Sequence, residues 1–426
     1  MLDDHKIEKA IVLGLCRNEV GQTRARAEEV ARYSLAELVE LAETAGLEVV
    51  GEALQFKNKP DAAYAAGSGK LLEIADLAEK LEAEVLVLDH NLSGSQMRNI
   101  SDLTGLKVLD RTLIILDIFA SRASTREGRL QVEIAQLQDR ATRLVGAGKA
   151  LSRLGGGIGT RGPGETQLET DRRHIQSRIS YLKKALAEVH RQRDLTRSNR
   201  DRNNVTKVAV VGYTNAGKSS LINSLTEADL LAMDQVFASL DPTARRLKDS
   251  EIPIILIDTV GFIRNLPHRL VEAFKSTLAE VSHADIIIQV TDLSDPEYDL
   301  QMSVVEKQLI QLKADQKARI QVFNKIDLAD PSLVRKIKAG DRHDRGLVFT
   351  SVKDGRGLAE LKQEIMDIPL RQMLPFHLVI PFSEPEILAK LQEVAYIDSL
   401  SYTDEGADVV FKLRQSDLGL IEPLLL

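Results

Sequence analysis

Residues 212–219 constrain the fold more than any other part of this chain, because they have the pattern Gly-x-x-x-x-Gly-Lys-Ser. The apolar run 207–211 comes directly before them, and a helical pattern opens at Ser220. In this strand–loop–helix setting, backbone N–H groups and the helix N-terminus face a phosphate, while the lysine reaches the β- and γ-phosphates. The serine hydroxyl is placed to ligate Mg²⁺. We therefore expect nucleotide contacts from Gly212, Tyr213, Thr214, Asn215, Ala216, Gly217, Lys218, Ser219 and Ser220.

A second motif follows the apolar run 254–257. Its residues are Asp258, Thr259, Val260 and Gly261. The aspartate offers a carboxylate to the Mg²⁺ shell, and the glycine N–H is able to meet a γ-phosphate. Taken alone, Asp258 is also compatible with an ordinary carboxylate at the end of a strand.

Two more motifs indicate that the nucleotide is GTP. The apolar run 320–323 leads into Asn324, Lys325, Ile326 and Asp327, and this aspartate accepts hydrogen bonds from guanine N1–H and the 2-amino group together. Adenine has neither donor, and a buried acceptor left unpaired would reject it by roughly several kcal/mol. After the run 347–349, we expect three residues to close over the base: Thr350, Ser351 and Val352.

The segment between the loop and Asp258 contains a candidate switch residue. Thr243 follows Asp241 and Pro242 and is placed to meet Mg²⁺ only when a γ-phosphate is present. A plain turn around Asp-Pro is the alternative. We predict that Lys218, Thr243 and Gly261 take part in catalysis, and that Ser219, Thr243 and Asp258 hold Mg²⁺.

Phe262 stands where Ras-like GTPases carry a glutamine that orients the attacking water. Phenylalanine cannot position water, so slow intrinsic hydrolysis is expected, with the missing group supplied by a partner or a monovalent cation. Asn215 is a candidate K⁺ ligand, because several similar GTPases use Asn at this loop position. It is equally able to cap its own loop.

Composition indicates several globular domains. The chain has 426 residues, of which 43% are hydrophobic and 28% charged. Its single cysteine, Cys16, lies in an apolar run and is expected to be a buried structural thiol. We find no signal peptide and no membrane span in the sequence, which favours a cytoplasmic protein that associates peripherally with ribosomes or membrane. We expect a monomer.

The formal net charge of −7 conceals a basic block, since residues 120–202 hold 18 Lys and Arg against 9 Asp and Glu. Apolar residues recur there at steps of three and four, from Leu130 to Leu144 and from Ile175 to Val189. This periodicity predicts two helices in an antiparallel hairpin, joined by about 25 residues with a Gly-rich tip. We predict that the hairpin binds RNA; a solvated helical surface with a plain linker is the alternative. The expected RNA contacts are Lys149, Arg153, Arg161, Arg172 and Arg173.

The fold class expected for the whole chain is multidomain α/β. It comprises an N-terminal α/β domain (1–120), the helical hairpin (121–203), a P-loop GTPase domain (204–370) and a small C-terminal α+β domain (371–426). In the N-terminal domain, residues 67–70 imitate a phosphate loop, but Tyr64 replaces the first glycine and Leu71 follows the lysine. We interpret this segment as a helix cap, and Asp89-His90 as a turn rather than a site.

The run 155–173, together with residues 212–219, 237–243 and 258–264, resembles the HflX family of bacterial ribosome-associated GTPases. The resemblance covers the whole chain. It implies GTP and GDP as ligands, binding to the 50S subunit and its 23S rRNA, and splitting or rescue of stalled 70S ribosomes with ribosome-stimulated hydrolysis. Val352 departs from the alanine usual in the family.

Two alternatives remain at this point. One is a GTP-switched RNA-binding assembly factor or RNA chaperone, in which turnover is incidental. The other is a GTPase partner of an RNA-modifying enzyme, although the chain contains no second catalytic cluster.

Overall fold

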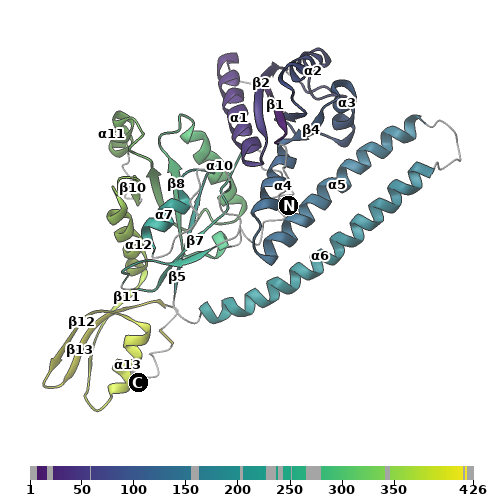
Figure 1. Cartoon of the computed structure of the whole chain (residues 1–426). Coiled ribbons are helices and arrows are strands. Elements are labelled where there is room, and N and C mark those ends of the chain that lie inside the picture. Colours follow the sequence, from purple (N-terminus) through teal and green to yellow (C-terminus); the bar gives the residue numbers. More distant parts are fainter. Residues whose placement is uncertain are drawn as a thin grey trace, which may run out of the picture. The chain divides into compact units, whose positions relative to one another are not determined.

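The computed structural model describes residues 7–16, 23–57, 59–154, 163–201, 205–226, 237, 243–250, 252–264, 280–340, 346–415 and 418–419, without the side chains of 145–154, 163–168, 193–201 and 393. The chain forms two compact units (Figure 1). The first extends to Arg193 and includes Phe237, and the second takes in the rest of the described chain from Asp194. Among the described residues, no helix is both long and apolar enough to span a membrane.

The first unit is built on a four-stranded parallel sheet with the order β2-β1-β3-β4. The expected alternation of strands and helices is confirmed, because aliphatic runs such as Val85–Leu88 are buried along their whole length, as strands covered on both faces must be. Cys16 is 1% exposed, as predicted. The elements are β1 (Lys9–Cys16), α1 (Arg24–Thr44), β2 (Glu48–Phe56), α2 (Ser68–Leu81), β3 (Val85–Leu88), α3 (Gly94–Thr104), β4 (Lys107–Asp110) and α4 (Arg111–Arg122).

Helix starts in this unit agree with local sequence signals. Helix α2 begins at Ser68 with Gly67 at its N-cap, so residues 67–70 form a helix start. Ser93 and Gln96 form a reciprocal capping box at the start of α3. Asp89, at the end of β3, accepts hydrogen bonds from Ser34 Oγ at 2.5 Å and from Arg111 at 3.0 Å. This carboxylate therefore helps to bind α1 and α4 to the sheet.

The helical hairpin consists of α5 (Arg126–Leu154) and α6 (Pro163–Asp201), which run in opposite directions (Figure 1). Arg178 contacts Glu133 at 2.8 Å, and His190 lies 3.3 Å from Glu127. The antiparallel pairing is as expected, but the predicted connection of about 25 residues is wrong. Only residues 155–162 separate the helices, because good helix formers extend each helix beyond its apolar periodicity.

The second unit contains a six-stranded sheet with the order β10-β9-β8-β5-β7-β6, in which only β6 is antiparallel to its neighbour. Strands predicted at 207–211, 254–257, 320–323 and 347–349 are all present. Helix α7 begins at Lys218 rather than at Ser220, because the phosphate loop turns directly into the helix. The elements are β5 (Thr206–Gly212), α7 (Lys218–Leu225), β6 (Ala244–Arg246), β7 (Ile254–Asp258), β8 (Ile286–Asp292), α10 (Tyr298–Gln311), β9 (Ala318–Asn324), α11 (Pro331–Gly340), β10 (Leu347–Phe349) and α12 (Leu358–Gln372).

The C-terminal part of the second unit is an antiparallel sheet with the order β11-β13-β12. Helix α13 (Pro385–Val394) covers one face of it through a core that includes Leu391 and Phe411. The expected α+β composition is present. The sequence pattern indicates a helix followed by strands at 396–402 and 409–413, and the structure adds a strand before them. The strands are β11 (Leu374–Ile380), β12 (Tyr396–Thr403) and β13 (Gly406–Leu413).

One aromatic contact brings a distant part of the chain to the first unit. Phe237, which lies between the phosphate loop and Thr243, is 2% exposed. Its ring meets Phe119 of α4 edge-on, with 4.7 Å between the ring centroids. Such edge-to-face pairs contribute about 0.5–1.5 kcal/mol beyond the burial of their area. The residue is thus anchored on α4.

Candidate active site

The phosphate loop lies at the carboxyl end of β5, where neighbouring parallel strands also deliver their functional residues. Gly217 has φ +88°, and a Cβ added there would lie 2.4 Å from Nδ2 of Asn324. That amide donates a hydrogen bond to the Ala216 carbonyl at 3.0 Å. Only glycine fits this approach, so the loop and the guanine motif at the end of β9 are fixed against each other.

Lys218 occupies a buried position in the loop. It is 7% exposed, and its Nζ donates to the Tyr213 carbonyl at 2.6 Å. Burial lowers the pKa of Lys218 to about 8, although the nearby charge of Asp258 acts in the opposite direction. A buried ammonium with one neutral acceptor favours the arrival of an anion.

Three oxygen-bearing residues come together beside the loop. Ser219 Oγ donates to Asp258 Oδ2 at 3.0 Å, and the Asp258 N–H donates to the Thr243 carbonyl at 2.9 Å. Within the described residues, Asp258 Oδ1 and Thr243 Oγ1 are buried without a hydrogen-bond partner. Oxygen ligands of this kind suit Mg²⁺, so these residues fit the metal that the sequence predicts.

Gly261 packs tightly between the loop and Lys218. A Cβ at this position would lie 3.0 Å from Lys218 Nζ and 3.0 Å from Thr214 Cα. The following residue, Phe262, is 2% exposed and packs into the core with Val211. Its side chain therefore does not face the phosphates, which agrees with the expectation that it positions no water.

A short parallel bridge joins the loop to the segment after Gly261. The Thr214 N–H donates to the Phe262 carbonyl at 2.8 Å, and the Phe262 N–H donates to the Gly212 carbonyl at 3.0 Å. The Arg264 N–H also donates to the Tyr213 hydroxyl at 2.9 Å. The Tyr213 hydroxyl thus supports this bridge, and the nucleotide contact expected of Tyr213 stays a prediction.

The residues predicted to select guanine meet at the carboxyl ends of β9 and β10. The Ser351 hydroxyl donates to Asp327 Oδ1 at 2.7 Å, and this hydrogen bond lowers the pKa of Asp327. The Thr350 hydroxyl donates to Asn324 Oδ1 at 3.1 Å. The aspartate is therefore held ionised, as an acceptor for two base donors must be.

Lys325 makes a contact that sequence analysis missed. Its Nζ lies 2.7 Å from Asp292 Oδ2, at the end of β8. The sequence shows an aspartate at the end of an apolar run, but it does not show that this run becomes the neighbour of the strand that bears the guanine motif. The buried Thr259 hydroxyl donates to the Val210 carbonyl at 2.7 Å, and the nucleotide contact expected of this residue stays a prediction. Val352 is half-buried against the core.

The predicted RNA-contact residues lie on the hairpin. Arg172 and Arg173 are on α6, with side chains 61% and 80% exposed and only loose ion pairs to Glu169, at 4.0 and 3.6 Å. Lys149 and Arg153 fall within α5 rather than in a loop, and their side chains lie outside the described residues. Arg161 also lies outside the described residues.

Comparison with known proteins agrees with this site. Residues 32–120, 122–200 and 207–325 match family models described as GTP-binding GTPase N-terminal, GTP-binding GTPase Middle Region and 50S ribosome-binding GTPase. The chain is 44% identical over 416 residues to the GTPase HflX of Caldanaerobacter subterraneus subsp. tengcongensis, covering 95% of both chains. The chain belongs to the HflX GTPase family. As an HflX GTPase it binds guanine nucleotides and hydrolyses GTP.

A second relative agrees with the HflX assignment, and one solved structure is similar to part of this chain. The GTPase HflX of Escherichia coli strain K12 is 39% identical over 381 residues, with 89% of each chain covered. A solved GTP-binding protein from Sulfolobus solfataricus in complex with GDP is similar over 85% of this chain and 98% of that chain, with 23% identity and a TM-score of 0.44.

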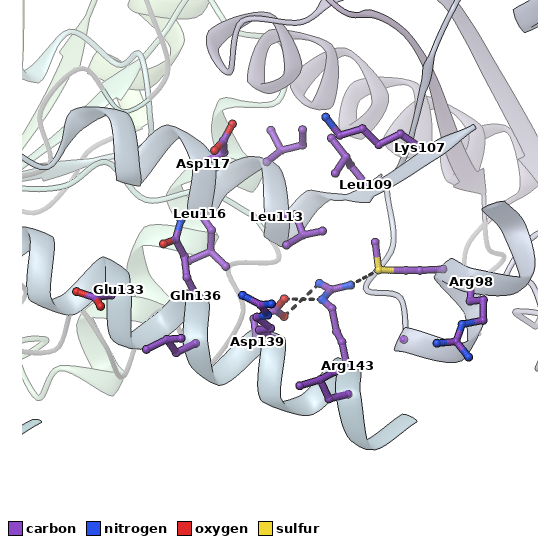
Figure 2. Close-up of a pocket in the computed structure, with 16 residues that line it drawn as sticks. Arg98, Lys107, Leu109, Leu113, Leu116, Asp117, Glu133, Gln136, Asp139 and Arg143 are labelled. Carbon is purple, nitrogen blue, oxygen red and sulfur yellow. Dashed lines mark hydrogen bonds and ion pairs between the residues drawn. The ribbon is translucent and has the colours of Figure 1, made fainter. Parts of the chain in front are cut away.

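The first unit contains a cavity that no GTPase motif lines. This cavity of ≈ 730 Å³ lies among α3, β4, α4 and α5 (Figure 2). Arg143 projects into it and is held by Asp139 (Figure 2). Asp110 also contacts Arg143, at 3.0 Å. Leu109, Leu113 and Leu116 supply apolar lining. The fixed arginine joins α5 to β4.

Proposed function

We propose that this member of the HflX family binds the 50S ribosomal subunit in the cytoplasm and splits or rescues stalled 70S ribosomes, with GTP hydrolysis stimulated by the ribosome. One observation carries the proposal. A guanine-nucleotide site occurs in the same chain as a helical hairpin whose region, residues 120–202, holds twice as many basic as acidic residues. A nucleotide switch joined to a cationic arm suits reversible binding to a large RNA.

In this proposal, Lys218 neutralises the β- and γ-phosphates and the Gly261 N–H meets the γ-phosphate. Ser219, Thr243 and Asp258 hold Mg²⁺, which supplies charge neutralisation along the phosphates when it is bound. The buried Thr243 Oγ1, which has no partner among the described residues, supports this role. Asn324, Lys325 and Asp327 select guanine.

A group from outside the GTPase domain activates hydrolysis in this mechanism. The buried Phe262 side chain does not reach the attacking water, so a ribosomal group or K⁺ must orient that water instead. Asn215 is exposed at φ +60°, at the open side of the loop, and is the residue we propose for K⁺.

The hairpin supplies the RNA contacts. Exposed ion pairs such as those of Arg172 and Arg173 with Glu169 contribute little energy, so these arginines exchange the carboxylate for rRNA phosphates at small cost. We therefore propose 23S rRNA as the ligand of α6.

The test is steady-state GTP hydrolysis by the full chain, in K⁺ and then in Na⁺, alone and with purified 50S subunits or 70S ribosomes. Stimulation of tenfold or more, about 1.4 kcal/mol off the barrier, is the expected result. Light scattering of 70S ribosomes in the same samples measures splitting. Hydrolysis that ribosomes leave unchanged would favour the GTP-switched RNA chaperone instead.

Matched variants separate the two parts of the mechanism. Lys218→Ala should abolish hydrolysis but leave 50S co-sedimentation in place. Arg172→Gln with Arg173→Gln should weaken co-sedimentation and leave basal hydrolysis unchanged. Arg32→Gln removes an exposed arginine of α1 and serves as the charge control. Normal splitting by both test variants would refute the coupled mechanism.

A further inference from the structure

The C-terminal sheet carries an exposed aromatic pair. Phe382 is 60% exposed and Tyr402 is 67% exposed, yet their rings are stacked, with 6.3 Å between centroids and 16° between planes. Two large rings held together in solvent bury little of their area in this chain. Exposed apolar surface of this kind marks interaction sites more often than it occurs by chance.

The same region has further apolar exposure. Leu374, Val379 and Leu400 are 41%, 42% and 36% exposed. Together with the aromatic pair they make five of the eleven large hydrophobic side chains found exposed among the described residues, although residues 374–426 are a small part of the chain. Leu400 lies two residues before Tyr402 on β12 and therefore on the same face of the sheet, so it extends the apolar surface beside the aromatic pair. Val379 pairs with Asp408 and lies on the opposite face, and Leu374 lies at the other end of β11.

Charge determines which partner fits this surface. Residues 374–426 contain three Lys and Arg against nine Asp and Glu. Four exposed carboxylates flank the aromatic pair in sequence, and in the described part of the chain none of them is in an ion pair: Glu384, Glu386, Asp404 and Glu405. RNA phosphates would be repelled here, whereas Lys and Arg would find both carboxylates and aromatic faces.

The backbone beside the pair is also open. Strand β12 lies at the edge of its sheet and pairs only with β13 among the described strands. Six of its eight residues are exposed. An edge strand offers unpaired N–H and C=O groups to an extended peptide, and side chains at alternate positions of that peptide then contact the neighbouring surface.

From these observations we infer that Phe382, Tyr402 and the edge of β12 form a docking site for an extended, Lys/Arg-rich segment of a partner protein. Main-chain pairing along β12 provides the affinity, and cation–π and ion-pair contacts provide the preference for basic side chains. This site is distinct from the hairpin, which we propose binds RNA, and it does not depend on the proposed ribosome splitting.

The test uses the full chain and fluorescence anisotropy of a labelled peptide with four Arg-Val repeats. A peptide with four Glu-Val repeats and an octauridylate are the comparison probes. We expect the basic peptide to bind at low salt and the acidic peptide not to bind. Phe382→Ala with Tyr402→Ala should weaken basic-peptide binding at least tenfold, and so should neutralisation of the four flanking carboxylates.

Leu328→Ala is the matched control, because Leu328 is 67% exposed but lies outside the C-terminal sheet. It should leave peptide binding unchanged. The aromatic variants remove exposed side chains, so the melting temperature and basal GTP hydrolysis should stay at wild-type values. Undiminished peptide binding by the double variant would overturn the inference. So would octauridylate binding that this variant abolishes, or self-association of the wild-type chain that depends on the two rings.

Discussion

Gly261→Ala tests whether the position of one backbone N–H controls GTP hydrolysis. The added Cβ would lie 3.0 Å from Lys218 Nζ, from Thr214 Cα and from Thr214 Cγ2. Carbon atoms in contact prefer about 3.5–4.0 Å, so the neighbouring atoms must give way by a few tenths of an ångström. Thr214 Cα belongs to the phosphate loop and cannot give way as a side-chain tip would.

A displacement of about 1 Å costs roughly 10²-fold in rate, so a shift of a few tenths of an ångström costs about tenfold at most, or about 1.4 kcal/mol of transition-state stabilisation. We therefore expect kcat for Gly261→Ala to fall by more than about threefold and by up to about tenfold. Affinity for GDP, which lacks the γ-phosphate, should change by less than about twofold, since the loop amides that hold the β-phosphate remain.

Single-turnover hydrolysis at saturating GTP measures the change in the rate of hydrolysis, and binding of a fluorescent GDP analogue measures the change in GDP affinity. Gly69→Ala is the matched control, because a Cβ at Gly69 meets nothing within 4 Å. Hydrolysis by Gly261→Ala within about threefold of wild type, or an equal loss of GDP and GTP affinity, would refute the reasoning.

Three further predictions concern the same site. Burial lowers the pKa of Lys218 from its ordinary 10.5 to about 8 in the nucleotide-free chain. GTP affinity, measured by isothermal titration, should therefore fall as pH rises above 8. The free energy of unfolding without nucleotide, measured by thermal melts, should increase between pH 8 and 10.5, because the unfolded chain binds the Lys218 proton more tightly. A GTP affinity that stays constant up to pH 10 would contradict this. Asp327→Asn should weaken GTP binding on the order of 10²-fold and favour xanthosine triphosphate, whose C2 carbonyl accepts a hydrogen bond where guanine donates one. Competition binding with both nucleotides measures this preference. An unchanged preference for GTP would exclude the role assigned to Asp327. Tyr213→Phe removes the acceptor of the Arg264 N–H, so kcat should fall about 3–10-fold with the GDP Kd unchanged; an equal effect on both would instead indicate general damage to the loop.

The chemistry of the site was predictable from sequence because its residues recur at short, fixed distances after buried strands. Ser219 and Asp258 meet as the motifs require. The contact of Lys325 with Asp292 was not predictable, since it joins the ends of two strands that become neighbours only in the folded sheet. The bridge between the phosphate loop and Phe262 was not predictable for the same reason, because it joins segments that become neighbours only in the folded sheet.

Helices and strands were missed or predicted too short where the local sequence pattern is not typical of the element that forms. Residues 111–122 received no element from the sequence analysis, because their dense run of Leu and Ile lacks a polar face; in the structure they form α4, which is buried along most of its length. The predicted hairpin helices were too short, because Gly146 and Gly148 interrupt the apolar repeat. Strand β11 was hidden by Pro375, which an edge strand tolerates.

The contact between Phe237 and Phe119 has a practical consequence for work with fragments. A fragment that starts at Asp194 would contain every GTPase motif but would carry Phe237 without its aromatic partner. A ring that is 2% exposed in the full chain would then face water, at a cost of about 1.5–3 kcal/mol. Thr243, the residue predicted to act as a switch, follows only six residues later, so in the fragment this segment would lack its contact with α4. Hydrolysis rates intended to describe the full protein should therefore be measured on chains that retain α4.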